Sequence, residues 1–257
     1  MKKLGHAGTR RQLFRAIVAG AASVPFLAVR KSESAPCPSV RPCAACFLKG
    51  TKISTPSGYR AVQELQIGDD VNTLAGRKAI KWIGYNKFTK EEGRTWPDSV
   101  MPIRVARSAI DEHSPRSDLY LSPLHCLFFN KAFIPVKHLV NGTSVAQLAP
   151  FDMSEIEYYH IDLETHEVIY AEGALVESFF DGDSEREHFS NFVQYERLYG
   201  AEPQPKMTPF APILGYRNRR EKIEGVARSL ISNVVDVRDP VQIAHDQIAR
   251  RAEAMLV

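Results

Sequence analysis

One cysteine in this sequence is placed where it can attack the chain's own backbone. Cys46 follows Ala45 and precedes Phe47 and Leu48. A cysteine thiolate can add to the carbonyl carbon just before it, which converts the Ala45–Cys46 peptide bond into a thioester. The exchange is uphill because the resonance of the amide is lost. It therefore requires a reactive sulfur, a strained or well-oriented carbonyl and an acid for the departing amine.

Ser122 and His125 can supply the other groups that this exchange needs. An imidazole titrates near neutral pH, so His125 is the candidate acid for the leaving nitrogen. The Ser122 hydroxyl can hold the carbonyl oxygen or a distorted peptide. His166, beside an expected turn, is a further candidate. The alternatives are a buried structural thiol for Cys46, an ordinary core histidine for His125, and for His166 a histidine that a hairpin turn simply tolerates.

These residues lie in a segment whose pattern is typical of an all-β domain. From residue 47 to about 181, short alternating runs end at turn formers, and no long helical period occurs. We expect one strand over residues 79–83, ending at Gly84. We also expect a hairpin in which residues 158–163 pair with residues 167–170.

The pattern becomes helical after residue 183. Residues 184–187, Ser-Glu-Arg-Glu, form a capping box, and Gly200 is a plausible helix stop. The apolar residues at helical spacing between them are Phe189, Phe192, Val193 and Tyr199.

A proline-rich linker over residues 203–212 separates this helix from a second one. Asp239 and Pro240 provide the N-cap and N1 signals of the second helix. Its apolar stripe consists of Ala244, Ile248, Ala252 and Met255. We interpret residues 183–257 as a helical extension that packs on the β domain or on a partner.

The first 35 residues have the pattern of an export signal. Arg10 and Arg11 precede an apolar run over residues 16–28, which is shorter than the ~20 residues that a membrane span needs. The paired arginines resemble a twin-arginine signal, which implies the twin-arginine export machinery as a partner and a periplasmic or extracellular destination. A basic amphipathic helix is the alternative. Residues 36–45 then form a short flank ahead of Cys46.

The composition argues against several other classes. The 257 residues are 44% hydrophobic and 25% charged, which is ordinary for a globular protein. A formal net charge of +3 is too small to indicate nucleic-acid binding, and the basic residues at 217–220 are more simply a solvated face. We expect no membrane span in the mature chain and no cofactor.

The cysteines leave two further hypotheses open. Three of the four, Cys37, Cys43 and Cys46, lie within ten residues and, with a histidine, could ligate zinc in a zinc-binding β module. Only one pair has Cys-x-x-Cys spacing, so we expect no metal. A Cys43–Cys46 disulfide is more plausible after export, and it would block the nucleophile as a redox lock.

Three motifs occur together between residues 46 and 180. Their residues are Cys46, Gly50, Thr51, Gly58, Gly68 and Asp69, then Ser122 and His125, then residues 166–176. Together they resemble the Hint domains found in inteins and in the self-processing half of hedgehog proteins, which carry Thr-x-x-His where this chain has Ser-x-x-His. The closest fit is to bacterial stand-alone Hint proteins.

The resemblance implies a mainly β fold and a self-processing reaction. The fold would be compact, horseshoe-like and pseudo-two-fold over residues 46–182. The reaction would be an N–S acyl shift at Cys46, with water or a small thiol or amine as the acceptor. Splicing inteins end in His-Asn, whereas the matching places here hold Glu177 and Ser178, and neither can form a succinimide. The resemblance therefore implies N-terminal autocleavage without splicing, and the alternative is a catalytically silent exported binding module of the same fold.

Overall fold

The computed structural model describes residues 45–148, 153–182, 185–200, 206–215 and 239–255. Several expected features lie outside these ranges: the export signal, Cys37, Cys43, the arginines at 217, 219 and 220, and the first residue of the capping box.

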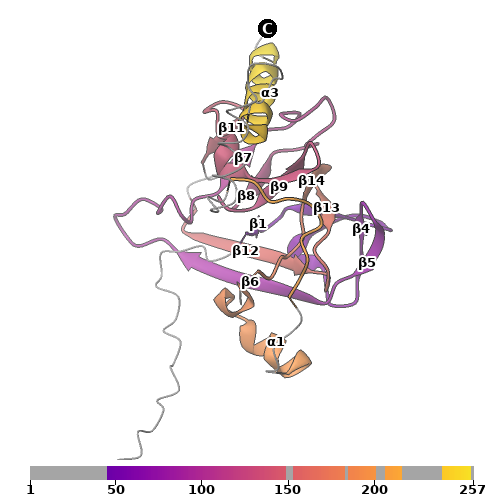
Figure 1. Ribbon diagram of the computed structural model, residues 1–257. Helices are drawn as coiled ribbons and strands as arrows, with labels where there is room; N and C mark the ends of the chain where they lie inside the picture. The colour runs from indigo at the N-terminus through magenta and orange to yellow at the C-terminus, as the bar shows by residue number, and fades with distance from the viewer. Residues whose placement is uncertain (1–44, 149–152, 183–184, 201–205, 216–238, 256–257) are drawn as a thin grey trace, which may run out of the picture. The chain divides into compact units, whose positions relative to one another are not determined.

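Two antiparallel sheets form the described β domain (Figure 1). The six-stranded sheet has the order β11 (Val145–Gln147), β7 (Ile103–Val105), β8 (Leu119–Leu121), β1 (Phe47–Leu48), β12 (Glu155–Asp162) and β6 (Trp82–Thr89). The eight-stranded sheet has the order β10 (Ala132–Pro135), β9 (Cys126–Phe129), β14 (Ala174–Glu177), β13 (Val168–Ala171), β2 (Lys52–Thr55) and β3 (Gly58–Ala61), with β4 (Asp70–Thr73) and β5 (Gly76–Ala79) attached through β13. The expected mainly β class is confirmed.

Apolar side chains from both sheets form the core. Alternate residues of the strands point inward, so that Phe47, Ile53, Leu121 and Val176 are fully buried in one cluster. Burial of side chains of this size contributes ~1.5–3 kcal/mol each to the free energy of unfolding. This packing fixes β1, and with it the start of the chain's described part, in the centre of the six-stranded sheet.

The expected hairpin between residues 158–163 and 167–170 is wrong. β12 pairs with β1 and β6 in one sheet, whereas β13 pairs with β14, β2 and β4 in the other. The connection is a tight turn in which Glu164 has φ 72° and donates its amide to Asp162 Oδ1. A short polar loop between two apolar runs predicts a turn but does not show which sheet the next strand joins.

The expected strand over residues 79–83 is also wrong. β5 ends at Ala79, because the amide of Ile80 donates to the Asp69 carbonyl and that of Lys81 to the Asp162 carbonyl. β6 then begins at Trp82 and continues through Gly84. Gly84 is a packing glycine, since a Cβ there would lie 2.6 Å from the Phe189 ring.

The helix expected after residue 184 is divided. A 3-10 turn, η3 (Glu185–His188), is followed by α1 (Phe192–Tyr199), which ends at Gly200 as expected. The break arises because Asn191 bonds to β6: its side chain accepts from the Tyr85 amide and donates to the Ile83 carbonyl. Val193, expected to be buried, is 55% exposed.

The second helix, α3 (Pro240–Ala254), begins as expected. The Asp239 side chain accepts from the Val241 amide, and Pro240 stands at the first helical turn. Its buried residues are Ala244, Ile248 and Ala252, whereas Met255 is 48% exposed, contrary to expectation. Ala244 and Ile248 belong to the main core cluster, so this helix packs on the β domain. Among the described residues, no helix has the length and apolar character that a membrane crossing would need.

Candidate functional site

Cys46 and Ser122 form a reciprocal pair of hydrogen bonds. The Cys46 amide donates to Ser122 Oγ at 2.8 Å, and the Ser122 amide donates to the Cys46 carbonyl at 2.9 Å. Antiparallel pairing of Phe47 with Leu121 places the two residues side by side just beyond the ends of β1 and β8. The Ser122 hydroxyl therefore contacts the nitrogen of the Ala45–Cys46 bond, which is one of the two places expected for it.

The Ser-x-x-His spacing brings His125 to the same place through a tight turn. The His125 amide donates to the Ser122 carbonyl at 3.0 Å, and the Val136 amide donates to the His125 carbonyl at 2.9 Å. The His125 side chain is fully buried, and its ring centre lies 4.3 Å from that of Phe47. The turn thus holds both predicted residues against the first two residues of the β domain.

Burial lowers the pKa of His125 to about 3. The backbone carbonyls of Glu177 and Cys46 face the ring and oppose this shift, while His166 adds to it. Neither ring nitrogen forms a hydrogen bond of ordinary geometry with the described residues. The expectation that His125 titrates near neutral pH is therefore wrong for this state: the imidazole is neutral at pH 7 and carries one N–H and one lone pair.

His160, which the sequence interpretation passed over, lies against His125. It projects from β12, is 2% exposed, and has its ring centre 5.1 Å from that of His125. Burial lowers its pKa well below the usual value, and the neighbouring His125 and His166 lower it further. In the sequence, the only indication that His160 is buried was its place in the alternating pattern of a predicted strand.

His166 lies in a separate aromatic setting. Its ring stacks on Phe133 with ring centres 4.5 Å apart, and Nδ1 accepts a hydrogen bond from the Phe210 amide at 3.4 Å. Burial lowers its pKa to about 4, so the 3.8 Å contact between Nε2 and Glu177 Oε2 is not an ion pair at neutral pH. Its ring is held by Phe133, Phe180, the Phe210 amide and Glu177, so the structure places His166 in this aromatic setting and not at the reactive bond.

Glu177 and Ser178 are held by backbone groups. Glu177 Oε1 accepts from the Cys126 amide at 2.6 Å. Ser178 Oγ accepts from the Glu167 amide at 2.9 Å and donates to the Thr165 carbonyl at 3.4 Å. Both side chains therefore fix β14 against its neighbours.

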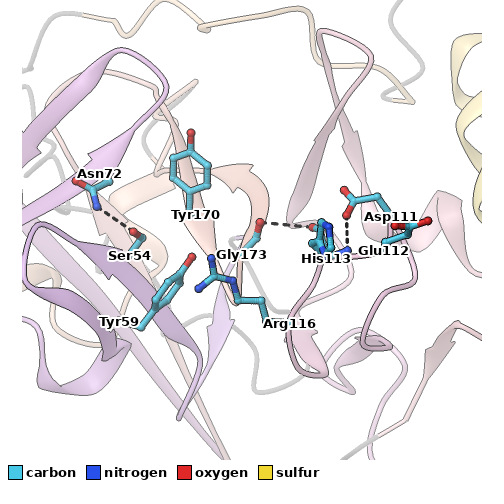
Figure 2. A pocket seen from close by; sticks show the side chains of 10 residues that line it. Ser54, Tyr59, Asn72, Asp111, Glu112, His113, Arg116, Tyr170 and Gly173 are labelled. Carbon is cyan, nitrogen blue, oxygen red and sulfur yellow. Dashed lines mark hydrogen bonds between the residues drawn. The ribbon is translucent and has the colours of Figure 1, made fainter.

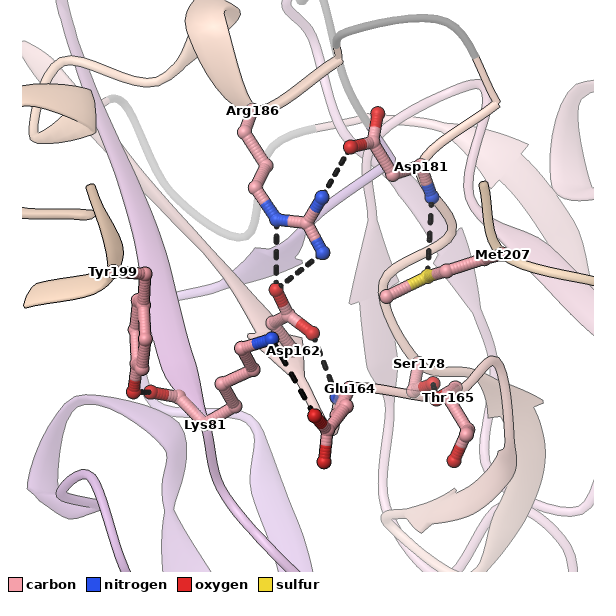
Figure 3. Close-up of polar contacts among 9 residues, drawn as sticks. All are labelled: Lys81, Asp162, Glu164, Thr165, Ser178, Asp181, Arg186, Tyr199 and Met207. Atoms are coloured by element: carbon pink, nitrogen blue, oxygen red, sulfur yellow. Dashed lines mark hydrogen bonds and ion pairs between the residues drawn. The ribbon is translucent and has the colours of Figure 1, made fainter. Parts of the chain in front are cut away.

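A buried ion pair ties the segment after β14 to the strand that carries His160 (Figure 3). Both Nε and Nη2 of Arg186 donate to Asp162 Oδ2, at 2.9 and 2.8 Å, and Nη1 pairs with Asp181. The guanidinium also lies over the rings of Phe179 and Tyr195, 4.8 Å from each ring centre. This cluster supports Phe179, which packs against His160.

An open groove of about 800 Å³ lies elsewhere in the β domain (Figure 2). The Arg116 guanidinium lies 4.8 Å from the centre of the Tyr59 ring, beside the β13–β14 turn at Gly173. None of the predicted site residues lines this groove. Across the ranges that the structure describes, no group of three or more His, Cys, Asp or Glu side chains is placed to hold a metal ion.

One comparison with known proteins, the match to a family model, agrees with the motifs. Residues 45–183 match a family model described as Hint domain. A comparison with curated proteins gave no match. Among solved structures, the crystal structure of the gp41-1 intein is 13% identical, with a TM-score of 0.35, and the match covers 51% of this chain and 97% of that chain. The solution structure of a bacterial intein-like domain from Clostridium thermocellum is 11% identical, with a TM-score of 0.35 and coverage of 52% and 98%.

The family match spans more than half of the chain and includes Cys46, Ser122, His125 and His166. It begins one residue before the cysteine and ends after β14. This chain belongs to the Hint domain family.

Proposed function

We propose that this Hint domain processes itself by an N–S acyl shift at Ala45–Cys46, followed by cleavage of that bond without splicing. The observation that supports this most directly is the 2.8 Å hydrogen bond from the Cys46 amide to Ser122 Oγ. It places a hydroxyl on the nitrogen that must leave. Membership of the Hint domain family also supports a self-processing reaction.

The shift conserves all atoms of the chain. The Cys46 sulfur forms a bond to the Ala45 carbonyl carbon, the bond from that carbon to the Cys46 nitrogen breaks, and the thiol proton ends on this nitrogen. His125 is neutral in the resting state and can accept the thiol proton and return it to the amine. Ser122 holds the departing nitrogen in place through its hydroxyl.

The surroundings of Cys46 favour a protected thioester. The residue is 2% exposed and packs in an apolar cluster with Trp96, Val100 and Tyr158. Exclusion of water slows hydrolysis of a reactive intermediate. The proposed acceptor is therefore water that enters slowly, or a small thiol or amine.

The end of the Hint segment supports cleavage rather than splicing. Glu177 and Ser178 stand where splicing inteins have His-Asn, and both side chains are engaged in hydrogen bonds to backbone amides. Neither side chain can cyclise to a succinimide. We propose no role for His166 in the shift itself, since it lies among Phe133, Phe180 and Phe210.

We also propose that the chain is exported. The twin-arginine-like segment before residue 35 would direct it through the twin-arginine machinery to a periplasmic or extracellular location. There, a Cys43–Cys46 disulfide would hold the nucleophile inactive until it is reduced.

Intact mass of the purified chain, with and without dithiothreitol, tests the acyl shift. The wild type is expected to lose everything before Cys46 in a thiol-dependent manner. Cys46→Ala is expected to stay intact, whereas Cys126→Ala, the matched change at the other buried cysteine, is expected to cleave like the wild type. An unchanged wild-type mass under every condition would contradict the proposal and leave a silent binding module.

A further inference from the structure

His160 is in direct ring contact with His125, although the acyl shift at Cys46 assigns it no part. It stands opposite Gly84 in the pairing of β12 with β6. Its ring centre lies 5.1 Å from that of His125 and 5.9 Å from that of Phe47. Two buried imidazoles therefore lie against the residue that follows the proposed nucleophile.

The surroundings of His160 would suit a phenylalanine better than a histidine. Phe47, Phe179 and Phe189 are its aromatic neighbours, with ring centres within 6.5 Å. Its Nδ1 is buried and forms no hydrogen bond with any residue that the structure describes. An unpaired polar atom in such a place lowers stability, so packing alone does not account for an imidazole here.

Few ionisable groups act on His160. From the β8–β9 turn His125 faces it, and from the segment before β13 His166 acts at longer range. β1, β6 and the segments around Phe179 and Phe189 present Phe47, Gly84 and aromatic rings to it. Both imidazoles of the pair are neutral in the resting state, because burial disfavours the charged form of each.

We infer that His160 is a positioning residue for the acyl shift, and that it shares with His125 the proton in transit from Cys46 Sγ to the Cys46 nitrogen. This inference rests on the proposed function. It needs no further reactant, because the proton lost by the thiol is the one gained by the leaving amine.

The pair interacts most strongly while it carries the proton. A protonated His125 donates from both ring nitrogens. One is needed at the Cys46 peptide, and for the other His160 competes with the Glu177 backbone carbonyl, which also faces the ring. A rotation about χ2 that brought His160 Nδ1 within ~2.7–2.9 Å of the other ring nitrogen of His125 would form a charge-assisted hydrogen bond. Since this bond is absent in the neutral pair, it stabilises the charged intermediate selectively and accelerates the reaction.

Thiol-induced cleavage of the full chain tests this role in His160→Phe, His160→Gln and the exposed control His113→Gln. His160→Phe is expected to cleave ~10–100-fold more slowly, the usual effect of losing a group that orients a catalytic residue. Its melting temperature is expected to stay the same or rise, because an unpaired buried nitrogen is removed. His160→Gln, whose amide oxygen can still accept a hydrogen bond, is expected to regain part of the rate, and the control is expected to match the wild type.

The outcomes separate this inference from the proposed function. A wild type that does not cleave overturns both. A wild type that cleaves, with His160→Phe cleaving at the same rate, overturns the inference alone. If His160→Phe does not fold, the pH–rate profile of His160→Gln decides: a shift of its acid limb towards lower pH supports proton sharing, whereas a wild-type profile and rate contradict it.

Discussion

Ser122 Oγ accepts a hydrogen bond from the Cys46 amide at 2.8 Å, and the Ser122 amide donates back to the Cys46 carbonyl at 2.9 Å. The two bonds join β1 to the turn after β8 at the point where the proposed reaction begins. Because the hydroxyl lies on the nitrogen side of the Ala45–Cys46 bond, its expected contribution is to the departure of the amine.

Removal of this hydroxyl is expected to slow the reaction more than it destabilises the fold. Ser122→Ala is expected to lower the rate of thiol-induced cleavage by ~10²-fold and the free energy of unfolding by ~1 kcal/mol. Ser122→Thr keeps the hydroxyl and is expected to restore most of the rate. Ser178→Ala, which also removes a fully buried hydroxyl bonded to a backbone amide, serves as the control. Equal rates in Ser122→Ala and Ser178→Ala would remove Ser122 from the mechanism.

Stability is expected to fall as the pH is lowered. The pKa of His125 is about 3 and that of His166 about 4 in the folded state, both below the usual 6.5. Between these values and 6.5 the unfolded chain binds more protons, so stability is fully present above pH 6.5 and is lost progressively below it. At pH 5 each histidine is expected to cost ~2 kcal/mol of unfolding free energy.

Urea denaturation at pH 7 and pH 5 measures this change in the free energy of unfolding. His166→Phe is expected to reduce the difference in stability between the two pH values by ~2 kcal/mol, the contribution of one histidine, whereas the exposed His113→Gln is expected to leave it unchanged. A stability that is the same at both pH values would show that the histidines are not held neutral by burial.

Phe189, which lies between η3 and α1, packs closely on Gly84 of β6. A Cβ on Gly84 would lie 2.6 Å from the Phe189 ring, so Gly84→Ala is expected to destabilise the fold by ~1–3 kcal/mol through overpacking. In a double-mutant cycle with Phe189→Ala, the penalty of Gly84→Ala is expected to disappear. Strictly additive losses in thermal or urea unfolding would contradict this packing.

Removal of one partner of the Asp162–Arg186 ion pair is expected to destabilise the fold strongly. Arg186→Leu leaves the fully buried Asp162 carboxylate without its partner, with an expected loss of ~3–5 kcal/mol. Asp162→Leu combined with Arg186→Leu is expected to be less destabilised than the single change, because no buried charge is left over. A double variant that is less stable than Arg186→Leu would indicate that the net attraction of the pair exceeds its desolvation cost.

The sequence predicted those features of the structure that depend on residues close together along the chain. The Ser-x-x-His spacing, the Asp239 N-cap and the mainly β class all depend on short-range geometry, and the structure agrees with them. The partners of β12 and β13 could not be predicted, since a turn does not specify the sheet that the next strand joins. His160 was missed for a related reason: it lies on β12 and contacts His125 in the β8–β9 turn, far away along the chain, so no local spacing indicates the contact.

Electrostatic properties were the least predictable from sequence. A histidine is expected to titrate near neutral pH until its surroundings are known. Complete burial of His125 beside Phe47 lowers its pKa to about 3 and changes its proposed part from a resting acid to a carrier of the thiol proton.

Capture of the thioester with hydroxylamine tests the central claim most directly. Hydroxylamine attacks thioesters, so the full-length chain is expected to yield an N-terminal fragment that ends in a hydroxamate on Ala45 and a second fragment that begins with a free Cys46. Peptide mass spectrometry identifies both ends. A chain whose Ala45–Cys46 bond stays intact would contradict the account, whatever happens at Asn141–Gly142, a pair that hydroxylamine can cleave without a thioester.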